Sequence, residues 1–325
     1  MEVYIFQQDV YNRLYSCDYM NATEWSTFAM PRPYLGSICI LLGITNLIAY
    51  LSCLSVMRKR KFYCNSCYKI MFFLGCMDSV CLVFNHFISG VFLATGTIFC
   101  LYPNLQYISG SIMVACWFGE CIGCLIIAFN RCVEILFPQI SVFLFEGGRT
   151  YLWISAMFLY AIFALFFVPP ITLNSALIMW FYDPYALIPT AVVPVDRMEY
   201  ASLINDLNTY VVIGSVVVLY VIIIIAVRIK AANSGKIHRQ IFITALFICS
   251  LNVIAGFVYI LLLLVPSNNF WLYVCLFAWM FSDGGGGLVL LVVNRTIRSE
   301  VKEMYRKRFF PKLTVVVVSS ITTTL

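Results

Sequence analysis

Residues 216–225 read VVVLYVIIII, an uncharged run that decides the fold. An α-helix rises about 1.5 Å per residue, so about 20 apolar residues cross the hydrocarbon core of a bilayer. The surrounding segment 207–229 has that length. Six further segments of the same kind complete the expected spans, at 34–57, 67–93, 107–131, 151–173, 207–229, 240–265 and 271–293. We therefore expect one all-α domain, a bundle of seven transmembrane helices.

The composition excludes a water-soluble fold. Hydrophobic residues make up 62% of the chain and charged residues only 11%, with a mean hydropathy of +0.92. A soluble domain carries about 25% charged residues. The net charge of +6 does not indicate a nucleic-acid partner, because the basic residues lie in short segments beside the apolar spans. The expected environment is the lipid bilayer.

The lysines and arginines predict the orientation of the chain. If the N-terminus lies outside the cell, eighteen of them face the cytoplasm and three, Arg13, Arg32 and Arg197, face outward. This distribution follows the positive-inside rule. We expect an extracellular segment at 1–33, the membrane domain at 34–293 and a cytoplasmic tail at 294–325. Apolar residues at helical spacing in the tail predict a short amphipathic helix on the inner membrane surface.

Ionisable and amide side chains inside the spans are candidate functional residues, because burying them in a membrane is costly. Taking the helical rise into account, five of them fall in one layer near mid-depth: Asn46, Asp78, Glu120, Asn252 and Asp283. They predict a central cluster that is hydrogen-bonded or binds a cation. The alternative, that they only fix the packing of the helices, stays open.

No catalytic constellation is present. The two histidines, His86 and His238, have no neighbours of the HExxH or triad type, and no phosphate-binding glycine loop occurs. The glycines at 284–287 lie inside the seventh span, where they permit close packing or a local bend. The cysteines form no paired CxxC motif that would bind zinc. We expect no enzyme activity, no metal and no cofactor.

The outer segments carry two cysteines, Cys17 and Cys100, and the long outer loop at 174–206 has none. Because the exterior is oxidising, a Cys17–Cys100 disulfide is expected; two unpaired thiols are the alternative. Asn21-Ala22-Thr23 is a glycosylation sequon on the same side.

The order of several short motifs resembles the nematode seven-helix chemoreceptors called serpentine receptor class t, within the class g superfamily. The motifs are Cys17, Glu24-Trp25, Arg32-Pro33, Gly36, Val56-Met57, Ser66-Cys67-Tyr68-Lys69-Ile70-Met71, Gly75, Asp78, Asn85, Gly90, Phe99-Cys100, Tyr102-Pro103, Trp117, Asn130-Arg131-Cys132 and Asn294-Arg295-Thr296-Ile297-Arg298.

The resemblance implies a G-protein-coupled chemoreceptor in the plasma membrane of a sensory cell, with a small-molecule ligand and a heterotrimeric G protein as partners. Asn130 and Arg131 at the end of the third span would form the coupling site, although no acid precedes the arginine. A role as a topology determinant is the alternative for Arg131. The expected ligand-lining residues are Asn85, His86, Tyr107, Trp117 and Tyr273; packing is the alternative for the aromatic ones. Dimerisation stays open.

Three other classes of membrane protein share features with this sequence. A retinal protein needs a lysine in the last span, and 271–293 contains none. Insect-type odorant channels place the N-terminus in the cytoplasm, against the distribution of basic residues. A transporter that uses the buried carboxylates remains the alternative, but transporters commonly show internal repeats, and the two halves of this chain are not similar.

Overall fold

The computed structural model describes residues 1–230, 236–264 and 269–309, and it confirms the seven-helix fold. Within these ranges, seven helices are long and apolar enough to cross a membrane. They are α4 (Pro33–Met57), α6 with its continuation α7 (Ser66–Leu82 and Ser89–Thr95), α8 (Pro103–Leu136), α10 (Thr150–Phe167), α11 (Leu203–Lys230), α12 (Lys236–Leu264) and α13 (Asn269–Val293).

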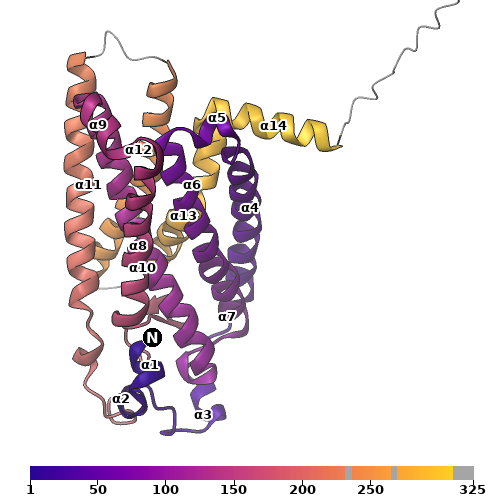
Figure 1. Cartoon of the computed structure of the whole chain (residues 1–325). Helices are drawn as coiled ribbons and strands as arrows, with labels where there is room; N and C mark the ends of the chain where they lie inside the picture. Colours follow the sequence, from indigo (N-terminus) through magenta and orange to yellow (C-terminus); the bar gives the residue numbers. More distant parts are fainter. Residues whose placement is uncertain (231–235, 265–268, 310–325) are drawn as a thin grey trace, which may run out of the picture.

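The two ends of the bundle differ in what covers them (Figure 1). One end, called the N-terminal end, carries α1 (Glu2–Phe6), α2 (Gln8–Leu14) and α3 (Ala22–Ser26). The opposite end, called the C-terminal end, carries α5 (Arg60–Tyr63), α9 (Pro138–Phe145) and α14 (Arg295–Phe309). Helix α14 runs sideways from the bundle. Its buried side chains are those of Ile297 and Val301.

Proline and asparagine set several helix boundaries. Prolines occupy the first turns of α4 and α8. A backbone N–H has no hydrogen-bond acceptor within the helix at this position, so proline, which lacks the N–H, does not weaken the helix there. Asn65 caps α6 by accepting hydrogen bonds from the backbone N–H groups of Cys67 and Tyr68. Helix α10 ends at Phe167, six residues before the expected end of that span, because Pro169 and Pro170 lack the donor that a helix needs.

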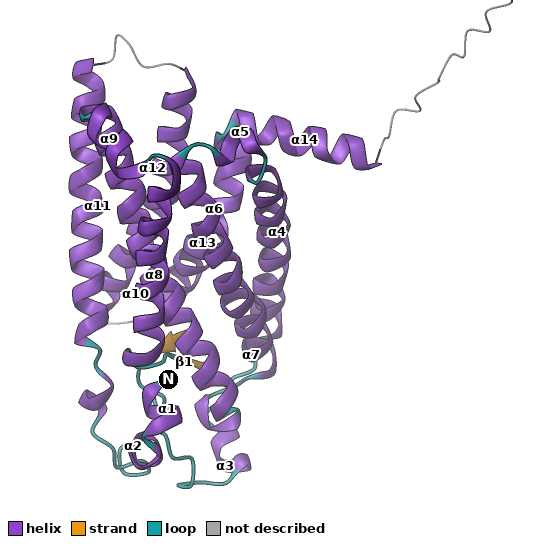
Figure 2. Cartoon of the chain, in the orientation of Figure 1, coloured by secondary structure: helices purple, strands orange, loops and turns teal. Residues whose placement is uncertain are grey.

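After α10 the chain forms a short antiparallel hairpin. Strand β1 (Thr172–Asn174) pairs with β2 (Met179–Phe181), with Leu173 opposite Trp180. The hairpin lies at the N-terminal end (Figure 2). The expected fourth span, 151–173, therefore included four residues that belong to a loop and two that belong to this hairpin.

The second span is not a uniform α-helix. A π-helical turn, η1, occupies Val83–Ile88 between α6 and α7. Such turns insert a residue into the helix and are frequent at functional sites. Asn85 and His86, inside this turn, are fully buried.

The glycine run in α13 serves close packing against α4, and the helix continues through it. A Cβ atom on Gly286 would lie 2.0 Å from the Tyr50 hydroxyl, and one on Gly284 would lie 2.3 Å from the Asn46 amide nitrogen. Only glycine leaves room for these two side chains of α4 to reach the centre of the bundle.

Candidate functional site

A cavity of about 410 Å³ lies toward the N-terminal end, between α8, α11, α12, α13 and the hairpin. This volume falls within the range typical of small-molecule pockets, about 300–1,000 Å³. Its wall is mainly apolar and aromatic. The lining residues are Val114, Trp117, Ile171, Leu177, Met179, Trp180, Phe181, Tyr182, Leu187, Asn205, Thr209, Ala255, Val258, Tyr259, Leu262, Leu272, Cys275 and Trp279.

The hairpin that closes one side of this cavity is fixed to α8 by backbone contacts. The amide of Gln106 accepts a hydrogen bond from the Leu173 N–H (2.6 Å) and donates one to the Leu173 carbonyl (3.2 Å). A Cβ atom on Gly110 would lie 1.7 Å from the carbonyl oxygen of Ile171. Because Ile171 also lines the cavity, the close approach at Gly110 defines part of the cavity wall.

The N-terminal segment packs as a cap on this end of the molecule. Tyr15 and Tyr107 are buried in a second hydrophobic cluster, separate from the bundle core. Tyr4 stacks on Tyr107 with 5.0 Å between the ring centroids, and Cys17 and Cys100 form a disulfide. Burial raises the pKa of Tyr11 to about 12, so its hydroxyl keeps its proton at physiological pH.

Of the five ligand-lining residues expected from the sequence, Trp117 lies on the cavity wall. The other four are not among the described residues that line it. Tyr107 belongs to the tyrosine cluster under the cap, and the Tyr273 hydroxyl lies 3.4 Å from the guanidinium of Arg32. Asn85 and His86 point into the polar core, because the π-turn rotates them there.

The five polar residues expected at mid-depth are all buried, in a layer that we call the polar core. The Tyr50 hydroxyl donates to Asp78, and the Asn85 amide donates to Asp283 at 2.5 Å. The Asn46 amide nitrogen lies 3.4 Å from Nε2 of His86. The layer is therefore a hydrogen-bonded network, with partners that the sequence did not assign to it.

Asn252 lies at one side of this layer with its own partners. Its amide oxygen accepts a hydrogen bond from Ser282 at 3.0 Å, and its amide nitrogen lies 3.4 Å from the sulfur of Cys124. These bonds connect α12 to α13 and to α8.

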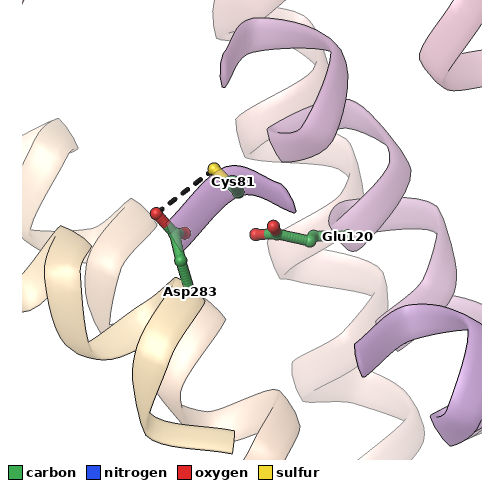
Figure 3. A group of neighbouring side chains, drawn as sticks. All are labelled: Cys81, Glu120 and Asp283. Carbon is green, nitrogen blue, oxygen red and sulfur yellow. Dashed lines mark hydrogen bonds between the residues drawn. The ribbon is translucent and has the colours of Figure 1, made fainter. Parts of the chain in front are cut away.

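Glu120 differs from its neighbours because neither of its carboxyl oxygens accepts a hydrogen bond from an amide, hydroxyl or thiol of the described residues, although the side chain is fully buried. Its partners are the carboxyl groups of Asp78 and Asp283, with which it can share a proton. Its carboxyl group points toward Cys81 and Asp283 (Figure 3). Each of these three residues has an oxygen or sulfur atom that could bind a metal ion, and these atoms lie within 4.8 Å of one another. The Cys81 thiol also donates a hydrogen bond to Asp283 at 3.3 Å. This group could hold a cation, a possibility that the sequence had left open for the layer.

Two members of the polar core could have been found by helical spacing. Tyr50 follows Asn46 by four residues and Cys81 follows Asp78 by three, so each shares a helix face with a residue that was predicted. The involvement of Asn85 and His86 depends on the π-turn, and no motif in residues 83–88 signals such a turn.

At the C-terminal end, Arg131 is held inside the molecule. The side chain is buried, and its guanidinium donates to the Asn130 amide oxygen at 2.6 Å. It also forms an ion pair with Glu134, one turn further along α8. Asn130 in turn donates to the Ser66 hydroxyl at 3.1 Å. No acidic residue precedes Arg131 in the sequence, but Glu134, three residues after it, is its ion-pair partner.

The start of the tail joins three helices at the same end. The Asn294 amide donates to the Tyr68 hydroxyl of α6 at 3.0 Å and to the Thr244 hydroxyl of α12 at 3.4 Å. Its amide oxygen accepts the backbone N–H of Ile297 and so caps α14. Rearrangement of α6, α12 or α14 would therefore disturb one shared residue.

Comparison with known proteins agrees with this architecture. Residues 2–312 match the family described as "Serpentine type 7TM GPCR chemoreceptor Srt". A Caenorhabditis elegans protein, "Serpentine receptor class T-55", is 18% identical over 244 residues, which cover 74% of this chain and 65% of that relative. The match thus spans slightly less than two thirds of the relative's length. A multi-pass location in the plasma membrane follows from the family and the seven apolar helices. The chain belongs to the serpentine chemoreceptor family Srt, a family of seven-transmembrane receptors that are generally not enzymes.

Proposed function

We propose that this protein is a G-protein-coupled chemoreceptor. A small molecule binds in the cavity near the N-terminal end and favours a second arrangement of the helices. In that arrangement Asn130 and Arg131 at the C-terminal end engage a heterotrimeric G protein. A ligand can shift such an equilibrium only by its difference in affinity for the two states, so the residues on the cavity wall must move between them.

One observation carries this proposal. Along each of three helices, a residue of the cavity wall, a residue of the polar core and a residue at the C-terminal end follow one another in the same order. In α8, Trp117 lines the cavity, Glu120 lies in the polar core and Arg131 lies at the C-terminal end. Helix α13 repeats the order with Trp279, Asp283 and the residue that follows the helix, Asn294.

Helix α12 repeats it with Tyr259, Asn252 and Thr244. Any displacement of these helices by a ligand therefore passes through the polar core to the C-terminal end. A rigid helix can carry such a displacement over its whole length.

The polar core is suited to switching because its hydrogen bonds can be exchanged. Glu120 accepts no hydrogen bond from an amide, hydroxyl or thiol of the described residues in this state. Its contacts with the carboxyl groups of Asp78 and Asp283 are favourable only while a proton is shared, because adjacent carboxylates repel each other. A rearrangement that gives Glu120 a donor would be favourable, and it would move α8 relative to α6 and α13. Packed interiors respond to such changes by moving between discrete arrangements.

The C-terminal end supports coupling because Arg131 is sequestered. Its contacts with Asn130 and Glu134 keep the guanidinium away from the surface. We take this to be the inactive arrangement. Release of the ion pair would present the guanidinium at this end, which also carries Lys59 and Lys61 at the start of α5.

Three features support an extracellular N-terminal end. The positive-inside distribution favours it. The Cys17–Cys100 disulfide lies there, and disulfides persist in oxidising surroundings. The sequon residue Asn21 is exposed there, and its amide oxygen accepts the N–H of Glu24 as a helix cap, which leaves the amide nitrogen to carry a glycan.

The test is G-protein activation in heterologous cells that display the receptor with an N-terminal epitope, challenged with a broad panel of small molecules. We expect a response that Arg131→Ala abolishes at normal surface display. Arg149→Ala is the matched control, because Arg149 is exposed at the same end and pairs only weakly, with Glu146 at 3.9 Å. Substrate uptake without G-protein activation would contradict the proposal and favour a transporter.

A further inference from the structure

We propose that the cavity takes an uncharged, mainly apolar molecule that carries one hydroxyl group, and that the amide oxygen of Asn205 accepts the proton of this hydroxyl. The signalling consequence rests on the function proposed above, whereas the binding itself does not. Two properties of the cavity carry the inference: none of the described residues of its wall is charged, and the amide oxygen of Asn205 on α11 is available to accept a hydrogen bond.

None of the described residues that line the cavity is charged. An ionised ligand would lose its hydration on entry without gaining an opposite charge, which costs far more than a hydrogen bond returns. Asp206, which follows Asn205 in the sequence, does not line the cavity and already accepts a hydrogen bond from Tyr259 at 3.1 Å. Carboxylates and ammonium ions are therefore excluded as ligands.

The aromatic side chains of the wall favour a compact apolar body. Trp117, Trp180 and Trp279 come from α8, β2 and α13 and face the same volume. The indole N–H of Trp180 already donates to Ser89 at 2.8 Å, so this ring offers its apolar faces only. Burial of apolar surface in such a pocket is the main source of affinity.

The hydrogen-bond directions at Asn205 define what the ligand must supply. The Tyr259 hydroxyl gives its proton to Asp206, so it can only accept from the Asn205 amide, at 3.2 Å. This fixes the NH₂ group of Asn205 toward Tyr259. The amide oxygen of Asn205 accepts no hydrogen bond from the described residues, so it is available to accept one from a ligand.

Thr209 lies one helical turn further along α11. It lines the same cavity, but its hydroxyl oxygen is buried beneath the wall and has no hydrogen-bond partner among the described residues. Asn205 is therefore the group that a ligand meets, and a ligand hydroxyl can donate its proton to the Asn205 oxygen. An ether or ketone can only accept, and it would leave the Asn205 oxygen without a partner.

The inference is tested by binding to the full-length receptor, purified and reconstituted in lipid nanodiscs. Four probes with eight carbon atoms differ only in their polar group: 1-octanol, its isomer heptyl methyl ether, octanoate and octylammonium. Tryptophan emission and the thermal unfolding midpoint report binding. We expect 1-octanol to bind about tenfold more tightly than the ether, because the ether leaves a buried acceptor unpaired, and the two ions not to bind.

Variants locate the effect. Asn205→Leu should remove the preference for the alcohol while the ether still binds. Ala255→Phe should fill the cavity and abolish the binding of both, and the smaller Ala255→Leu should weaken both if the phenylalanine variant does not fold. Val218→Phe is the control for partitioning of the probes into lipid, because Val218 is exposed on the outer face of α11.

Three outcomes would overturn the inference: equal affinity for the alcohol and the ether, tighter binding of either ion, or a preference that survives Asn205→Leu. Binding of none of the four probes would overturn it as well. The ligand class and the proposed function can fail independently of each other. If the alcohol binds as expected but no compound activates a G protein, the ligand class stands and the signalling role falls. If a charged compound activates the receptor through this cavity, the ligand class falls and the role stands.

Discussion

The cavity and the polar core are adjacent regions built on opposite principles. The cavity wall is apolar and aromatic, with an amide and a hydroxyl that have unused hydrogen-bonding capacity. The polar core, about one turn away along α8, buries three carboxyl groups in a network that spans α4, α6, η1 and α13. The first region offers space to a ligand, and the second offers alternative pairings to the protein.

This difference separates what each region can determine. Replacing an apolar residue on the cavity wall changes shape and volume, and hence which molecule binds. Replacing a residue of the polar core changes which helix arrangement is favoured. A carboxyl group such as that of Asp283 accepts hydrogen bonds from side chains of another span, so its loss weakens the contact between the two. Ligand choice and switching can thus be altered independently.

The largest effect is expected at the cap that closes the cavity end. Cys100→Ser removes the disulfide to Cys17, which closes a loop with a sequence separation of 83. Loss of a native disulfide typically costs about 2–5 kcal/mol, so the variant should unfold at a clearly lower temperature under non-reducing conditions. The control is Cys64→Ser, an exposed free cysteine at the C-terminal end; equal midpoints for the two variants would show that the cap is not anchored in this way.

A somewhat smaller effect is expected at Gly110, where α8 touches the hairpin. Gly110→Ala forces apart Ile171 and α8, at an overpacking cost of about 1–3 kcal/mol, and it should also change the affinity of any cavity ligand. Gly214→Ala is the matched control, because nothing lies within 4 Å of a Cβ atom there. Unchanged stability and unchanged ligand affinity in Gly110→Ala would contradict the described cavity wall.

In the polar core, replacing two neighbouring acids should change the free energy of unfolding in opposite directions. Glu120→Met removes one of three crowded, buried carboxyl groups, to which no amide, hydroxyl or thiol of the described residues donates, and should raise the free energy of unfolding by about 1 kcal/mol. Asp283→Leu leaves the donors of Asn85 and Cys81 without their acceptor and should lower it by about 1–3 kcal/mol. Thermal denaturation of the two purified variants measures both. Destabilisation by Glu120→Met would mean that Glu120 is paired, for instance with a cation.

The smallest effect is expected at the surface of the C-terminal end. Hydrogen bonds from Lys59 and Lys61 lower the pKa of Glu300 to about 2. A carboxyl group with a depressed pKa stabilises the folded state fully above its ordinary pKa of 4.5, and this contribution is lost as the pH falls through about 2.

Because the group is near the surface, Glu300→Gln should cost no more than about 1 kcal/mol at neutral pH. The difference in unfolding midpoint between Glu300→Gln and the unaltered receptor should shrink as the pH is lowered below 4.5. A difference that grows on acidification would contradict the role of these two lysines.

The sequence predicted the fold well because membrane burial leaves a strong signal in the sequence. Runs such as 216–225 cannot be placed in water, and the basic residues mark one side. The buried positions of Asp78, Glu120 and Asp283 also followed from helix length alone. Trp117 was placed correctly at the depth where the cavity lies.

What the sequence did not reveal depends on local backbone geometry and on side-chain pairing. The π-turn turns Asn85 and His86 into the polar core, and the residues of η1 carry no motif for it. The hairpin that forms part of the cavity wall consists of three-residue strands, too short for an alternating pattern to be recognised. Asn205 was read as part of a loop, although it lies in the first turn of α11.

The central claim is that the cavity and the Arg131 region are coupled, and reciprocity tests it most directly. The affinity of the most active compound from the panel is measured on reconstituted receptor with and without nucleotide-free G protein. Coupling of this kind is typically worth about 5–150-fold in affinity, equal in both directions. The account predicts such a gain in the unaltered receptor and none in Arg131→Ala, with equal affinities when the G protein is absent. The same affinity with and without G protein in the unaltered receptor would contradict it.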